Sequence, residues 1–146
     1  MENLFPNLSS GGHRVTSPAT IEYNCIAWAA DDPEVWWWPD PYNQYYWPPD
    51  VPREVNINSF VKAFEVLNYT VCETSNYESG YEKIAIYAKQ NGEPTHAARQ
   101  LDSGKWTSKL GRLEDIEHDD IAGVSGEIYG SVAVIMKRPK INLIKI

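Results

Sequence analysis

The sequence is poor in cysteine, with only Cys25 and Cys72 among its 146 residues. A secreted domain of this length that is framed by disulfides usually carries more cysteines, so we expect reduced thiols and a cytoplasmic location. The three histidines and two cysteines show none of the close spacings, such as CxxC or HxxxH, that are typical of zinc sites. The sequence therefore predicts no metal and no cofactor.

Long apolar runs and an excess of basic residues are also missing. No stretch approaches the roughly 20 apolar residues of a membrane-spanning helix, and the first 17 residues lack the pattern of a signal peptide. The formal net charge of -7 argues against nucleic acid or an anionic membrane as a partner. These absences favour a soluble protein whose partner is a peptide or another protein, with its oligomeric state left open.

The patterns that are present predict one α+β domain, residues 1–146, in which helices come first and an antiparallel sheet follows. Residues 1–18 predict an irregular arm, and residues 138–146 a C-terminal tail. Helices are expected at 25–30 and about 59–67, capped by Asn24 and by Asn58 or Ser59. Strands are expected at 69–72, 83–88, 95–101, 105–110 and 131–136, and the acidic residues 113–121 predict one or two helical turns.

Between the two helices lies a segment, residues 36–50, with four tryptophans, three tyrosines and four prolines. Neither a regular helix nor an inner strand tolerates so many prolines, so a loop is expected. The loop could wall a ligand cleft or simply complete the core. Its candidate substrate-binding residues are Trp36, Trp37, Trp38, Tyr45, Tyr46 and Trp47.

Cys25 and His96 are the candidates for chemistry. Cys25 falls in the first turn of the predicted helix, where backbone amides and the helix dipole favour a thiolate. His96 opens a later strand and could take the thiol proton, after which the thiolate would attack a carbonyl and the imidazolium would protonate the leaving amine. Against this stands the common role of a free cysteine as buried packing.

The run Tyr23-Asn24-Cys25-Ile26-Ala27-Trp28, followed by Lys83–Tyr87 and a strand bearing His96, resembles the NlpC/P60, CHAP and wider papain-like group of cysteine peptidases and amidases. The resemblance implies a papain-like fold and a thiol hydrolase. Lys83 occupies the slot in which NlpC/P60 enzymes carry their histidine, so either the base has moved to His96 or catalysis is lost. The whole chain is also similar to an uncharacterised bacterial protein family that shares the aromatic segment and the 106–111 run.

The residue that would orient the imidazole depends on the strand register. Two-residue turns at Asn91-Gly92 and Ser103-Gly104 would place Gln100 and Lys109 on the face of His96. A one-residue shift would replace them with Glu82, Arg99 and Ser108. Asn24 and Lys109 are further candidates for orienting or oxyanion contacts. His118, within an acidic cluster, is the next base to consider.

The sequence thus predicts a cysteine hydrolase that cleaves an amide or isopeptide bond of a peptide, with Cys25 as nucleophile and His96 as general base. The alternative is a non-enzymatic module, with a degenerate papain-like fold, that binds a protein or ligand through the aromatic loop.

Overall fold

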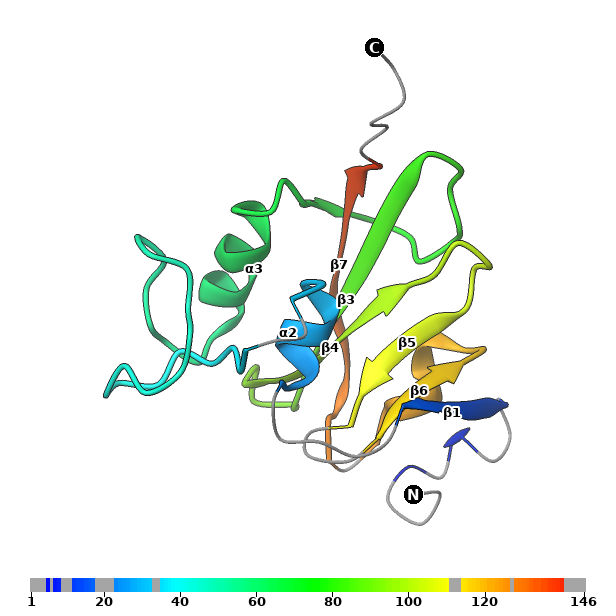
Figure 1. The fold of residues 1–146 in the computed structure, drawn as a ribbon, viewed down its shortest axis with the longest axis horizontal. Coiled ribbons are helices and arrows are strands. Elements are labelled where there is room, and N and C mark those ends of the chain that lie inside the picture. The colour runs from blue at the N-terminus through cyan, green and yellow to red at the C-terminus, as the bar shows by residue number, and fades with distance from the viewer. Residues whose placement is uncertain are drawn as a thin grey trace.

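In the computed structural model, the described residues are 5, 7–8, 12–17, 23–32, 35–110, 114–126 and 128–140. They form a seven-stranded antiparallel sheet with the strand order β1-β6-β5-β4-β3-β7-β2, which carries two short helices and a 3-10 turn (Figure 1). The elements are β1 (His13–Ser17), α2 (Cys25–Ala29), α3 (Ile57–Glu65), β2 (Thr70–Cys72), β3 (Tyr81–Ala88), β4 (Pro94–Gln100), β5 (Trp106–Lys109), β6 (Asp115–His118), η1 (Ile121–Val124) and β7 (Ser131–Pro139).

The predicted α+β, papain-like class is wrong, because the fold is β-rich. Strand β1 lies in the segment expected to be an irregular arm, and it pairs with β6, which lies where helical turns were expected. Strand β7 also runs to Pro139, into the expected tail, whose residues 141–146 lie outside the described part of the chain. Local sequence favoured loops and turns in these segments, whereas pairing with neighbouring strands satisfies their backbone groups and decides the outcome.

The two helices begin at asparagine caps. Asn24 precedes α2, and its side-chain oxygen accepts a hydrogen bond from the amide of Ala27, as the sequence predicts. Helix α3 is capped by Asn56 rather than by Asn58 or Ser59. Its buried face is made by Phe60, Ala63 and Phe64 at the predicted helical spacing.

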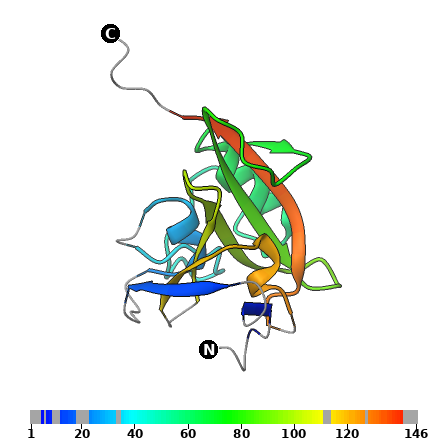
Figure 2. The same cartoon turned by 90° about the vertical axis from the view of Figure 1, so that its right-hand side faces the viewer.

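The sheet is buried on both faces. Ile84, Ile86 and Ala97 join the helices in one hydrophobic cluster, whereas Ala85 and Ala98 join a second cluster on the other side. Helices α2 and α3 cover the first face, which we call the helix face, and η1 lies against the second, which we call the η1 face. Figure 2 shows the strong twist of the sheet along β3 and β7.

The two central turns set the register. Tyr87 pairs with His96, as the sequence predicts, but not through the predicted two-residue turn. The amide of Lys89 donates to the carbonyl of Glu93, which leaves three residues in the turn, and an irregularity between Tyr87 and Ala88 restores the predicted pairing. The β4–β5 turn contains three residues instead of the predicted two, as the pairing of Arg99 with Thr107 shows. Gly104 takes the positive φ, 90°, that such a turn requires. This shift by one residue exchanges the two faces of β5 relative to the simple two-residue turn.

Within the described part of the chain, no helix is both long and apolar enough to cross a membrane. Cys25 and Cys72 are both free thiols.

Candidate functional site

A pocket of about 350 Å³ lies beside the first residue of α2. Four aromatic side chains and the Cys25 thiol contribute to its wall, and none of the described lining residues is charged. Its volume falls at the small end of ligand pockets, about 300–1,000 Å³. We call it the aromatic pocket, and its described lining residues are Asn24, Cys25, Trp36, Trp38, Tyr45, Thr95 and Tyr129.

One wall belongs to residues 36–53, which we call the aromatic arm. An ion pair locks the arm: the Asp40 carboxylate accepts from the Arg53 guanidinium at 2.7 Å and from the backbone amides of Gln44 and Tyr45. Arg53 also donates to the carbonyls of Asp40 and Tyr45. These contacts hold the pKa of the Asp40 carboxyl below its usual range, because its charged form accepts several hydrogen bonds. The arm is therefore ordered without regular secondary structure.

Asn24 joins the arm to α2. Its side-chain oxygen accepts from the amide of Trp37 at 3.0 Å, and its side-chain nitrogen donates to the carbonyl of Trp37. Since the same oxygen also caps α2, the amide group of Asn24 has a positioning role at the pocket wall rather than the orienting or oxyanion role expected from the sequence.

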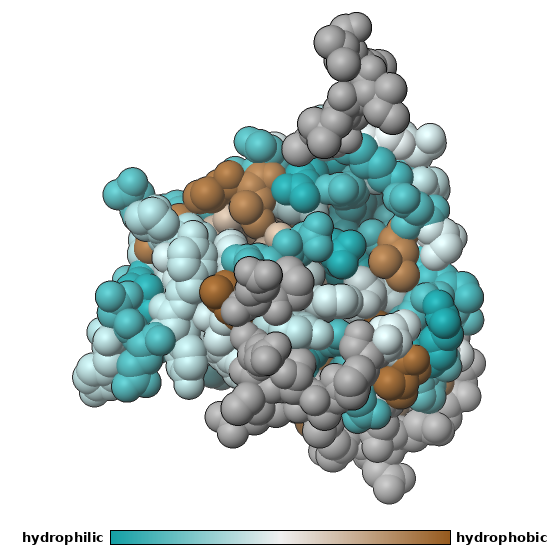
Figure 3. All heavy atoms as spheres, in the orientation of Figure 1, coloured by the Kyte–Doolittle hydropathy of each residue, from teal (hydrophilic) through white to brown (hydrophobic). Residues whose placement is uncertain are grey.

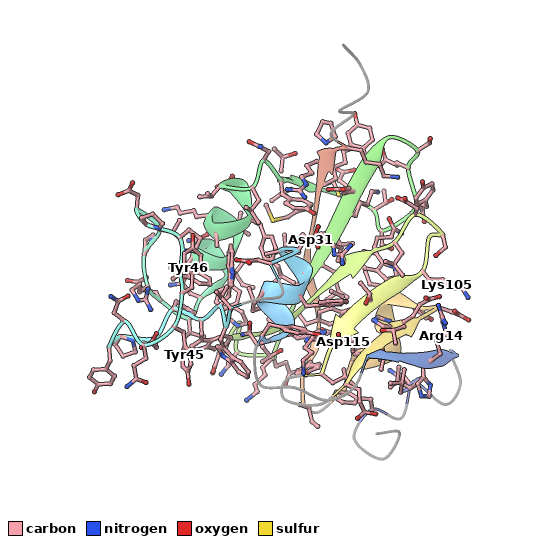
Figure 4. The ribbon with its side chains drawn as sticks, in the orientation of Figure 1. Arg14, Asp31, Tyr45, Tyr46, Lys105 and Asp115 are labelled. Carbon is pink, nitrogen blue, oxygen red and sulfur yellow. The ribbon has the colours of Figure 1, made fainter. Side chains whose placement is uncertain are left out.

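The six predicted binding aromatics separate into two groups. Trp36, Trp38 and Tyr45 line the pocket, whereas Trp37 and Trp47 are buried in the core with about 3–4% of their surface exposed. Tyr46 is exposed but does not line the pocket, and its ring packs on Trp37. Tyr45 and Tyr46 project from the arm in Figure 4, and the arm forms the pale surface at the left of Figure 3.

The Cys25 thiol is almost fully buried, with 5% of the residue exposed. Burial raises the pKa of the thiol to about 11, since the low-dielectric surroundings disfavour a thiolate. The sulfur lies 4.0 Å from the carbonyl oxygen of Thr95, which is an acceptor and gives no support to negative charge. The site as it stands therefore keeps Cys25 a neutral thiol at pH 7.

The structure does not bring His96 to Cys25 as a hydrogen-bonded pair. Successive side chains of a strand point to opposite faces, and on β4 it is Ala97 that joins the cluster of Cys25. His96 points to the η1 face, where its ring stacks on Tyr129 at 4.0 Å and lies near Tyr87. Its Nε2 is hydrogen-bonded to Ser108 at 3.0 Å.

His96 instead belongs to a buried chain of polar groups, which we call the histidine chain. Ser108 Oγ lies 3.0 Å from His96 Nε2 and 2.8 Å from His118 Nε2, and His118 Nδ1 lies 2.8 Å from the carbonyl oxygen of Asp120. All three of its side chains belong to fully buried residues, and burial lowers the pKa of both histidines, so both are neutral.

The direction of the hydrogen bonds along the histidine chain is fixed by the group at its end, the carbonyl oxygen of Asp120. A carbonyl can only accept, so His118 carries its proton on Nδ1, and its Nε2 accepts from the Ser108 hydroxyl. Ser108 then accepts from His96 Nε2–H. Among the described residues, His96 Nδ1 finds no hydrogen-bond partner and is left as a buried lone pair.

The two remaining residues predicted to assist catalysis, Gln100 and Lys109, lie on opposite faces of the sheet. Gln100 lies on the η1 face, but its amide donates to the carbonyls of Ser75 and Gly104 and does not orient His96. Lys109 was expected on the face of His96, yet the shifted register places it on the helix face, with its ammonium 5.5 Å from the Tyr23 ring. It is close enough to Cys25 for the two to interact electrostatically, and burial lowers its pKa.

Sequence reasoning missed Tyr129, which lines the aromatic pocket and whose ring stacks on His96. Its segment has no regular spacing, and the available signal was a single aromatic residue between Gly126 and Gly130, which form a bridge. The lock between Asp40 and Arg53 was missed as well, because no local pattern links a loop carboxylate to an arginine 13 residues away.

The fold and the pocket together define a β-rich domain that presents an aromatic pocket from a rigid loop. A family model described as "Domain of unknown function (DUF7689)" matches residues 14–137, and the chain belongs to this family. No curated protein and no solved structure matches the chain. These comparisons supply no link to the NlpC/P60 or CHAP enzymes.

Proposed function

We propose that the protein is a binding module that holds an apolar or aromatic side chain of a peptide segment in the aromatic pocket. The observation that carries this proposal is the pocket itself, whose walls include Trp36, Trp38, Tyr45 and Tyr129 and no charged side chain among the described residues. Rigid aromatic side chains give a large contact area at a small entropy cost, and such residues dominate binding hot spots.

The lock between Asp40 and Arg53 supports the same proposal. A loop that is already ordered loses little conformational freedom when a ligand binds, so more of the contact energy appears as affinity. Burial of Trp37 and Trp47 anchors the arm in the core, and Trp36 and Tyr45, whose ring centroids lie 5.9 Å apart, line the pocket.

The test is an NMR titration of the isotopically labelled protein with two peptides, acetyl-Gly-Gly-Phe-Gly-Gly-amide and its alanine analogue. We expect the phenylalanine peptide alone to shift the signals of the pocket residues. Trp36→Ala should weaken this binding at least tenfold, because it removes one pocket wall. The matched control is Tyr42→Ala, which removes a highly exposed aromatic from the same arm without altering the pocket. Equal affinities for the two peptides would refute the proposal.

A thiol hydrolase remains the second candidate, because the Cys25 sulfur lines the pocket and Lys109 lies on the same face of the sheet. In this mechanism the Lys109 amine takes the thiol proton, the thiolate attacks an amide carbonyl, and the leaving amine receives that proton. Water then hydrolyses the thioester and restores the thiol.

The two candidates differ in what Cys25→Ala does. For a binding module, this variant keeps its affinity for the phenylalanine peptide within about twofold, since one sulfur atom is a small part of the wall. For a hydrolase, the wild-type protein releases the fluorescent amine from a peptidyl-phenylalanine coumarin amide, and the variant does not. Turnover by wild-type protein that Cys25→Ala abolishes would favour the hydrolase.

A further inference from the structure

The aromatic arm and its flanks carry most of the chain's excess negative charge. Residues 30–55 contain six acidic residues and a single basic one, Arg53, in a chain with a formal net charge of -7. Arg53 is already engaged in the lock with Asp40. The exposed acidic residues of this stretch include Asp31, Asp50 and Glu54.

Two exposed basic side chains lie far from the arm. Figure 4 shows Arg14 and Lys105 at the edge of the molecule opposite Tyr45 and Tyr46. There they pair with Glu117, at 3.0 Å and 3.6 Å. Among the described residues, Asp31 lies 3.9 Å from the guanidinium of Arg99, which neutralises its carboxylate in part. No ion pair of the described residues engages Asp50 or Glu54, so the arm keeps a net negative charge, which attracts positive ligands and repels negative ones.

The pocket interior itself does not suit a cation. None of its described lining residues is a carboxylate, so a charge that entered would lose its hydration without gaining an ionic partner. Lys109, buried on the same face as Cys25, would add repulsion. The positive charge of a ligand is therefore expected outside the pocket, in water, and an apolar side chain inside it.

We infer that the partner of the arm is a basic peptide segment, in which an apolar or aromatic side chain is flanked by lysines or arginines. This inference rests on the proposed binding function and adds the charge of the ligand. The flanking cations interact with the carboxylates of Asp31, Asp50 and Glu54 through solvent, so they raise the association rate and the affinity at low salt.

The experiment compares three acetylated pentapeptide amides with a central phenylalanine, flanked on both sides by two lysines, two glycines or two glutamates. Calorimetry at about 50 mM and 300 mM salt should show the lysine peptide binding roughly tenfold more tightly than the glycine peptide at low salt, and the glutamate peptide more weakly. Salt should shrink these differences, because the Debye length falls below about 10 Å.

A triple variant tests the carboxylates directly: Asp31→Asn, Asp50→Asn and Glu54→Gln. Asp31 and Asp50 have positive φ, which asparagine tolerates, so the backbone should be kept. We expect the triple variant to lose the lysine advantage while its affinity for the glycine peptide stays unchanged. The control neutralises three exposed carboxylates outside the arm, Glu73→Gln, Asp102→Asn and Asp119→Asn, and should keep the advantage.

The outcomes separate the two proposals. Equal affinities for the lysine and glycine peptides, both lowered by Trp36→Ala, would overturn the basic partner and leave the pocket function standing. A lysine advantage that survives the triple variant, or that the control variant also loses, would likewise overturn it. Binding of no peptide, or binding that Trp36→Ala leaves unchanged, would overturn both.

Discussion

The histidine chain allows a quantitative prediction from one hydroxyl group. Ser108→Ala removes the oxygen that accepts from His96 and donates to His118, and it changes no other hydrogen bond of the described residues. The variant leaves an N–H on one imidazole and a lone pair on the other, both without a partner in a fully buried place. The substitution therefore leaves two buried imidazole groups without a hydrogen-bond partner at once.

The magnitude follows from the number of groups left unpaired. A buried polar group that loses its partner costs about 1–3 kcal/mol, so two of them cost about 2–6 kcal/mol in unfolding free energy. A water molecule in the space left by the hydroxyl would bring the cost to the lower end. We therefore expect a loss of about 3 kcal/mol, a large part of the stability of a domain of this size.

Urea denaturation followed by tryptophan fluorescence measures this loss. With an m-value of about 2 kcal/mol/M, the midpoint should fall by about 1.5 M while the slope stays constant. Ser103→Ala, in the exposed β4–β5 turn, is the matched control and should change stability by less than about 0.5 kcal/mol. Imidazole nitrogen NMR adds a direct readout: the proton should lie on Nδ1 of His118 and on Nε2 of His96. A loss below about 0.5 kcal/mol in Ser108→Ala, or the opposite tautomers, would refute the assigned chain.

Three further predictions concern protonation, thiol reactivity and backbone geometry. Burial lowers the pKa of His96 and His118 below 6.5, so at acidic pH the unfolded protein binds more protons than the folded protein does. The urea midpoint should therefore be constant above pH 6.5 and fall as the pH drops from 6.5 toward the folded-state pKa. A midpoint that does not change with pH would contradict this prediction. Burial raises the pKa of Cys25 to about 11, so iodoacetamide at pH 8 should alkylate Cys25 at least about a hundredfold more slowly than the more exposed Cys72. Peptide mass mapping measures the two rates. Comparable rates would contradict the burial of the Cys25 thiol. Gly130→Ala should lower the free energy of unfolding by several kcal/mol in thermal or urea denaturation, since a Cβ there would lie 2.0 Å from the carbonyl oxygen of Ala88. Gly92→Ala is the control, at a similar positive φ but in open space, and should cost only about 1 kcal/mol. Equal losses in the two variants would refute the steric argument.

Much of the local structure could be predicted from the sequence. Asn24 caps α2, the spacing of Phe60, Ala63 and Phe64 gives the buried face of α3, and a turn at Asn91-Gly92 joins β3 to β4. Each of these depends on residues within a few positions of one another, so local propensity and periodicity are sufficient.

The fold class and the candidate site depended on longer-range contacts. Strands β1 and β6 lie in segments with weak strand patterns, and they form because each offers the other a hydrogen-bonding partner. The aromatic arm could be recognised from its composition, but the division between pocket-lining and buried tryptophans depends on contacts with α2 and α3.

A single residue in the β4–β5 turn decided the chemistry around the two candidate residues. The sequence itself determined that a hairpin forms at Ser103-Gly104, and it left both registers open. Tertiary structure selected the three-residue turn, which places Ser108 beside His96 and Lys109 on the side of Cys25. Because side chains alternate between the faces of a strand, a shift of one residue exchanges every partner on β5, so one residue more or less in the turn decides which side chains meet on each face of the sheet.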